Sequence, residues 1–179
     1  MNSAAQFEAL RAWLLPITGL PAIIRAHPNA PRPQGRYGVL NLLSDERINW
    51  PHDITYAEDT AGATQIMHET REAAWSLNAY GEPASDALRG VQSASMSSAS
   101  LLDLFPLVLN RTSQVRRLPE LVGNRWEDRA QIDLFVRYQF RPEFAVDVVE
   151  TVPFAYNGEA GSITPPVPAF SPEFSGEFA

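Results

Sequence analysis

The clearest pattern in the chain is an alternation of apolar and polar residues in its last third. From Ile132 to Phe140 every even position is apolar, and all but one of the odd positions are polar. Successive side chains of a β-strand point to opposite faces, so this alternation predicts a half-buried strand. A turn is expected at residues 141–143. We therefore predict that residues 130–141 and 145–154 form an antiparallel pair whose even-numbered face packs on helices.

Residues 66–79 fit either a helix or a strand. We favour a strand, because a two-residue period places several apolar side chains on one face, although Glu69 and Arg71 interrupt it. The residues on that face are Met67, Ala73, Trp75, Leu77 and Ala79. Shorter strands are expected at Tyr37–Leu43, Ile54–Glu58 and Gln114–Leu118.

Two segments favour helices. Residues 3–15 begin with Ser3 and Gln6 at the spacing of a capping box, and Pro16 and Gly19 should end this helix. Its apolar side comprises Phe7, Leu10 and Leu14. Residues 83–105 should be mostly helical, although the Ser-rich stretch at 93–100 is a weak helix former. There we expect inward-facing Leu88, Val91, Leu102 and Phe105.

Helices and strands are segregated along the chain, which indicates an α+β domain. We expect a single domain over residues 1–155, with a mixed or antiparallel sheet and helices on one face. Residues 156–179 are rich in proline, glycine and phenylalanine and lack any regular period, which predicts an extended C-terminal tail.

Composition narrows the function further. The net charge is −7 and every one of the 14 basic residues is arginine, so diffuse binding to nucleic-acid phosphates is disfavoured. Cysteine is absent, which excludes disulfides and thiolate metal sites. We expect no membrane span, because no run of 18 apolar residues occurs. We also expect no signal peptide, because the first nine residues hold no basic region followed by an apolar stretch.

A search for catalytic or cofactor motifs finds none. The sequence has no Walker A loop, no GxGxxG and no GxSxG. His52-Asp53 favours a surface turn over a metal site, and His68-Glu69 lacks the second histidine of HExxH. We therefore predict a non-enzymatic protein with no cofactor and no metal. The alternating charges Arg125, Asp128 and Arg129 are typical of a salt-bridged surface or a subunit contact.

Three stretches resemble the phage neck and tail terminator family: Leu10–Pro21, Pro31–Asn41 and Arg125–Val152. In that family an N-terminal helix leads through a Gly turn to an Arg-bearing strand, here Ile23–Ala26. A Pro-rich loop then enters a Tyr-containing strand, and a Glu-x-Arg-Ala-Gln-hydrophobic strand follows near the end, here at 127–132.

The resemblance implies a virion protein that forms a ring, usually sixfold, at the head-proximal end of the tail tube. Its partners would be copies of itself, the tail tube protein and head–tail connector proteins, after synthesis in the bacterial host cytoplasm. DNA would pass through the channel without specific binding, and we expect a net acidic channel wall because like charges repel. Three alternatives stay open: another neck ring such as a tail-completion or head–tail joining subunit, a small hydrolase using His52, Asp53 and Glu58, and a single-strand nucleic-acid binder.

The C-terminal tail carries Phe170, Phe174 and Phe178, which we expect to contact a neighbouring subunit or partner. Pro172 and Gly176 oppose a helix there, and an extended segment can seat aromatic rings in pockets of another chain. Deleting residues 156–179 should leave the domain folded but weaken ring assembly or attachment to the next neck component. Chromatography with light scattering checks this, and a truncated protein that still assembles and caps tails normally would contradict it.

Overall fold

A computed structural model gives the fold, and it describes residues 1–27, 32–48, 53–59, 62–122, 124–146, 152–156 and 159–163. The chain divides into two compact units, one of residues 1–54 and 67–142 and the other of residues 55–66 and 143–179. None of the described helices is long and apolar enough to cross a membrane. The helices are α1 (Ser3–Thr18), α2 (Ala84–Ala94) and α3 (Ser98–Leu102). The strands are β1 (Ile23–Arg25), β2 (Tyr37–Arg47), β3 (Asp53–Asp59), β4 (Gly62–Tyr80), β5 (Val108–Thr112), β6 (Arg116–Arg117), β7 (Glu120–Val122), β8 (Arg125–Glu127), β9 (Arg129–Phe140), β10 (Glu143–Val146), β11 (Val152–Tyr156) and β12 (Glu159–Ile163).

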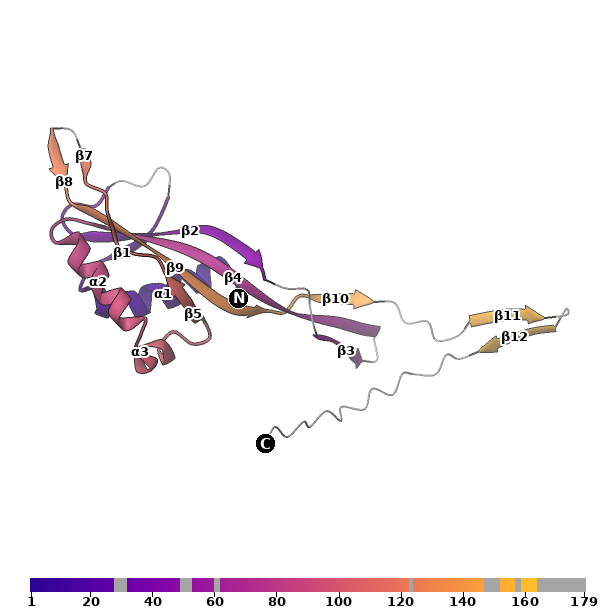
Figure 1. The fold of residues 1–179 in the computed structure, drawn as a ribbon. Coiled ribbons are helices and arrows are strands. Elements are labelled where there is room, and N and C mark those ends of the chain that lie inside the picture. The colour runs from indigo at the N-terminus through magenta and orange to yellow at the C-terminus, as the bar shows by residue number, and fades with distance from the viewer. Residues whose placement is uncertain are drawn as a thin grey trace. The chain divides into compact units, whose positions relative to one another are not determined.

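The first unit is built on the antiparallel pair β4 and β9 (Figure 1). Their register runs without interruption from Glu69 opposite Phe140 to Tyr80 opposite Arg129. The strand order is β1-β2-β4-β9-β5, with β6 also pairing β9; β1 and β2 are parallel and the other pairs are antiparallel. This arrangement confirms the α+β class, the mixed sheet and the strand over 66–79.

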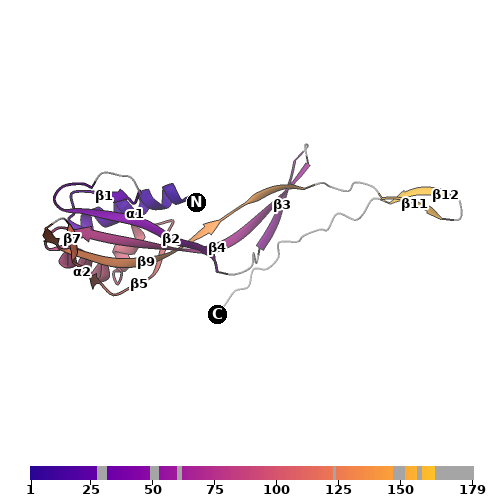
Figure 2. The same ribbon diagram turned by 90° about the horizontal axis from the view of Figure 1, so that it is seen from above.

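The helices cover one face of the sheet and leave the other open. The alternation of β9 holds as predicted, since Ile132, Leu134 and Val136 are fully buried and Tyr138 nearly so. They share one core with residues of α1, α2 and β4, including Leu10, Leu14, Trp75, Leu77, Leu88 and Val91. In Figure 2 the long strands β2, β4 and β9 run side by side, as their pairing requires. Phe140, at the end of the even-numbered row, is 36% exposed because it lies at the border of this core.

Helix α1 differs from its predicted boundaries at both ends. Asn2, not Ser3, caps its start, and its Oδ1 accepts from Ala5 N at 2.9 Å. Gln6 is fully buried instead of completing a capping box, and its Oε1 accepts from Trp75 Nε1 at 3.1 Å. The helix runs through Pro16 and ends before Gly19, whose left-handed backbone (φ 60°) lets its N–H reach Leu15 O.

The second helical segment breaks at its Ser-rich middle into α2 and α3. Leu88 and Val91 are buried as predicted, but Leu102 and Phe105 are 76% and 81% exposed, so their inward placement was wrong. The break resets the helical phase, and Leu104 and Leu107 are buried instead. The sequence pattern also missed β5, which lies beyond this turn.

The predicted pairing of residues 130–141 with 145–154 is wrong. Strand β9 already has β4 on one side and β5 with β6 on the other, so its backbone has no free edge for a returning strand. The chain after 142 instead forms β10, which pairs antiparallel with β4 at Ala63–Ile66. A strand has two edges only, and side-chain alternation does not report which neighbour fills each.

The second unit contains the β10–β4 pairing and a separate two-stranded ladder of β11 and β12. Strand β3, expected at Ile54–Glu58, is present and pairs with β4. Strand β12 falls inside the segment predicted as an extended tail, and residues 164–179 lie outside the described part. The division at residue 155 therefore stays a prediction.

The two charged residues that interrupt the apolar face of β4 form a polar border to the core. Arg71 donates from Nε to Asp45 Oδ1 at 2.9 Å and pairs with Glu69 at 3.4 Å. The Tyr138 hydroxyl donates to Asp45 Oδ2 at 2.6 Å. Burial first, and this hydrogen bond second, raise the pKa of Tyr138 to about 12, so the phenol is neutral at physiological pH.

At the edge of the sheet, α1 reaches across to β1. Arg11 donates from Nε to Ile23 O at 3.1 Å, so one backbone acceptor of this three-residue edge strand is already occupied. Gly38, opposite Ile23 in β2, leaves room for this packing, because a Cβ there would lie 3.0 Å from Ile23 Cγ1.

The register of β9 makes a direct prediction. Leu134→Asp should abolish folding, because it places a carboxylate in the core and removes a contribution of about 1.5–3 kcal/mol from apolar burial. Arg137→Asp is the matched control, since this side chain is 45% exposed on the opposite face and the fold should tolerate it. Circular dichroism and soluble yield distinguish the two variants, and equal behaviour would contradict the assignment of faces.

Candidate subunit and partner interface

A cluster of tyrosine, arginine and glutamate residues closes one end of the sheet. Tyr37 and Tyr80 pair across β2 and β4, and their rings stack at 4.8 Å with an interplanar angle of 10°. The guanidinium groups of Arg32 and Arg129 lie 4.9 and 5.4 Å from the centre of the Tyr80 ring. Both distances suit cation–π attraction, so the cluster combines aromatic stacking with positive charge.

Arg32 connects the loop before β2 to this cluster. Its Nε donates to the Tyr37 hydroxyl oxygen at 2.8 Å. Burial raises the pKa of Tyr37, although Arg32 opposes the shift, so the phenol stays protonated at neutral pH. The same guanidinium pairs with Glu127 and lies 3.7 Å from Glu120. One side chain thus joins the sheet, the loop and the hairpin of β7 and β8.

The β7–β8 hairpin is held at its base and exposed on its outer side. Arg129 Nη1 pairs with Glu120 Oε2 at 3.2 Å, while Nη2 donates to Asn78 Oδ1 at 3.0 Å. Farther along the hairpin, Leu121 and Trp126 stand opposite each other and are 55% and 72% exposed. A large exposed apolar pair on an anchored hairpin is typical of a contact surface.

Of the residues predicted as contacts, Asp128 and Arg129 are engaged within the chain. Asp128 Oδ2 accepts from Ala84 N at the start of α2 at 3.0 Å, and its Oδ1 pairs with Arg117 at 3.1 Å. Arg125, by contrast, is exposed and has no ion-pair partner among the described residues. Phe170, Phe174 and Phe178 lie outside the described part of the chain, so their contact role stays a prediction.

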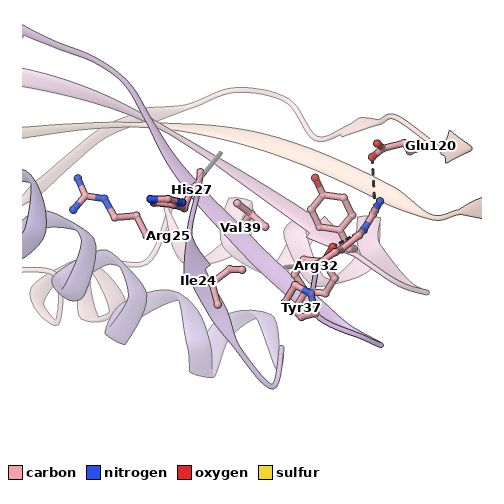
Figure 3. A pocket seen from close by; sticks show the side chains of 10 residues that line it. Ile24, Arg25, His27, Arg32, Tyr37, Val39 and Glu120 are labelled. Atoms are coloured by element: carbon pink, nitrogen blue, oxygen red, sulfur yellow. Dashed lines mark hydrogen bonds and ion pairs between the residues drawn. The ribbon is translucent and has the colours of Figure 1, made fainter. Parts of the chain in front are cut away.

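A pocket of about 200 Å³ adjoins the cluster (Figure 3). His27 and Arg25 lie on one side, and Arg32 with Glu120 on the other, joined by an ion pair. Its remaining lining residues are Ile24, Ala26, Pro33, Tyr37, Val39 and Tyr80. No serine, threonine or cysteine lines this pocket, and the described residues contain no group of three or more potential metal ligands.

The side chains of the alternative hydrolase site, His52, Asp53 and Glu58, lie outside the part of the chain that the structure describes. His68 lies on β4. The small-hydrolase alternative therefore stays a hypothesis.

The open face of the sheet carries arginines that acids and aromatic rings already engage. Glu72 receives Arg137 at 3.2 Å and Arg111 at 3.8 Å, and Asn110 donates to it at 2.8 Å. The Arg111 guanidinium also lies 3.5 Å from the centre of the Phe135 ring. Arg111 and Arg137 thus share the single carboxylate of Glu72, so these three side chains together keep one positive charge.

Comparison with known proteins identifies the family. The chain matches the family described as "Phage neck terminator protein" over residues 5–160, which covers the sheet, the helices and the hairpin cluster. The protein belongs to the phage neck terminator family. It is therefore a structural protein of the bacteriophage virion, located in the neck of the tail, and the resemblance seen in the sequence is confirmed.

No curated protein sequence matches this terminator family member. Among solved structures, one similar chain comes from the "Cryo-EM Structure of an Extracellular Contractile Injection System, PVC sheath/tube terminator in extended state". It is 12% identical with a TM-score of 0.44, over 87% of the terminator chain and 63% of the other chain. The terminator chain thus spans less than two thirds of that neighbour's length.

The position of Asp128 makes a prediction that separates stability from assembly. Asp128→Ala should lower the free energy of unfolding by about 1–2 kcal/mol, because it leaves the first N–H of α2 without its acceptor. Asp86→Ala is the matched control: among the described residues this exposed carboxylate forms an ion pair with Arg89 alone, so its loss should cost less than about 0.5 kcal/mol. Urea denaturation measures both. An unchanged unfolding midpoint for Asp128→Ala, together with lost assembly, would instead favour a subunit contact.

Proposed function

We propose that this terminator protein forms a ring of six copies at the head-proximal end of a phage tail tube. There it ends tube polymerisation and joins the tail to the head connector. Its partners are then copies of itself, the tail tube protein and connector proteins. The observation that carries the proposal is the family match over residues 5–160, which includes nearly all the described structure.

The arrangement of the surface supports an assembling role. The hairpin of β7 and β8 presents Trp126 and Leu121 to solvent, and a second group of exposed apolar side chains lies around α3. Monomeric proteins seldom leave several large apolar side chains uncovered together. Both surfaces favour a protein that is buried among neighbours in its working state.

The charge distribution supports a passive channel. Six copies with a net charge of −7 carry about −42 in total, and a negative wall repels DNA phosphates. The arginines of the open sheet face are engaged by Glu72 and Phe135. We accordingly propose that DNA crosses the ring without specific binding and that the protein has no enzymatic activity.

Another neck ring, such as a tail-completion or head–tail joining subunit, is the nearest alternative. Both would form rings, but only a terminator adds to the tube end and stops its growth. The two functions therefore differ in what they do to a growing tube.

The proposal predicts both a mass and an activity. Chromatography with light scattering should give about 119 kDa, the mass of six 19.8 kDa copies, as expected for closed cyclic symmetry. Added to polymerising tail tube protein, the ring should shorten the tubes and appear as a cap at one end in electron micrographs. An unrelated acidic protein of similar size is the control.

A monomer or dimer at assembly concentrations would contradict the ring. A ring that binds connector protein but leaves tube length unchanged would favour the head–tail joining alternative.

A further inference from the structure

Two apolar surfaces of the first unit are uncovered in the single chain. The hairpin surface comprises Leu121 and Trp126 on β7 and β8. The turn surface comprises Leu102, Phe105 and Val108, which are 76%, 81% and 59% exposed and connect α3 to β5. A hydrogen bond from Phe105 N to Leu102 O places the first two in one turn.

The sheet register keeps these two surfaces apart. Val108 pairs with Arg137 of β9, whereas the hairpin precedes Arg129, the first residue of the same strand. Eight residues of extended strand span about 27 Å. In Figure 1 the hairpin and α3 accordingly lie in different places on the unit. One copy therefore cannot cover its own turn surface with its own hairpin.

The hairpin and the turn also carry one charge each that has no ion-pair partner among the described residues, and the two charges are opposite. Arg125 directly precedes Trp126 at the tip of the hairpin, where its side chain leaves β8 on the opposite face of the strand. Asp103 lies between Leu102 and Phe105 in the sequence of the turn. Both charged side chains are exposed. The two elements thus match in chemistry: the hairpin presents an aromatic side chain on one face and a cation at its tip, and the turn presents apolar side chains and an anion.

We propose that the hairpin surface of one copy docks on the turn surface of the next copy in the ring. Trp126 inserts against Leu102, Phe105 and Val108, and Arg125 pairs with Asp103. Two different surfaces meeting head to tail are what a closed ring of identical subunits requires. The inference rests on the proposed ring and names the contact that closes it.

The base of the hairpin supports this role. Arg32 and Arg129 fix it to the sheet through Glu120 and Glu127, so Trp126 is presented on a hairpin anchored at its base. An anchor that is ordered before binding loses less conformational entropy when it docks. The same base would hold the hairpin in one direction on every copy.

Charge reversal tests the contact. Arg125→Asp and Asp103→Arg should each raise the concentration at which half the protein is assembled by roughly tenfold or more, and the double variant should largely restore it. Trp126→Ala should weaken assembly by at least a similar factor, because buried tryptophans dominate interfaces. Arg89→Asp is the control: it makes the same change of charge on an exposed residue of α2 and should leave assembly unchanged. Circular dichroism verifies that each variant is folded.

Disulfide trapping gives an independent readout, because the chain has no cysteine of its own. Arg125→Cys combined with Asp103→Cys should, on oxidation, give a covalent ladder of copies in denaturing gels. Arg125→Cys combined with Asp86→Cys should give none.

The outcomes distinguish a failure of the proposed ring from a failure of the proposed contact between the hairpin and the turn. A wild-type protein that forms no ring overturns the proposed function. An intact wild-type ring that all three hairpin and turn variants leave unchanged, with no covalent ladder, overturns the docking contact and leaves the function standing. Folded single-charge variants that lose the ring without rescue in the double variant overturn the pairing of Arg125 with Asp103.

Discussion

The uninterrupted ladder between β4 and β9 is the constraint on which the rest of the first unit depends. Because side chains alternate along both strands, the register of this pairing places four apolar side chains together on the helix side: Trp75, Leu77, Ile132 and Leu134. The same register places Glu72 and Arg137 on the open side. A shift by one residue would exchange the two faces, exposing the core and burying charges that have no partners there. The helices, the edge strands and the hairpin are all attached to this one pairing.

Features that depend on the local period of apolar residues could be predicted from the sequence. Features that depend on which strand pairs with which could not. The alternation of β9 and the class of β4 were readable, because a half-buried strand imposes a two-residue period on its own side chains. The partner of the chain after 142 was not readable, because backbone hydrogen bonds leave no trace in side-chain pattern. The inward placement of Leu102 and Phe105 was wrong for a related reason. The break after α2 changes the direction of the following turn, so the helical period before the break does not predict which side chains after it face the core.

The candidate interface was predictable in part. Arg125, Asp128 and Arg129 stood out as alternating charges, yet the structure gives them different tasks: one is exposed, and the other two secure α2 and the hairpin. Nothing in the sequence joined Arg32 and Tyr37 to Tyr80, more than 40 positions later, because that contact depends on the register of β2 on β4. The absence of lysine has a physical counterpart here. A planar guanidinium can lie on an aromatic ring while its edges bind two carboxylates, as Arg32 does, and an ammonium group cannot.

The contact between Arg11 and the backbone of β1 has a consequence for how copies can associate. An exposed sheet edge is a template on which further strands can be added without limit, the route by which fibres grow. Here the edge strand is three residues long, and a side chain from α1 occupies the carbonyl of Ile23. Copies meeting at this edge have too few free backbone groups to extend the sheet from one molecule into the next. Association at this edge must rely on side chains. Their shapes and charges specify one neighbour, and once they are buried in that contact they cannot bind a further copy.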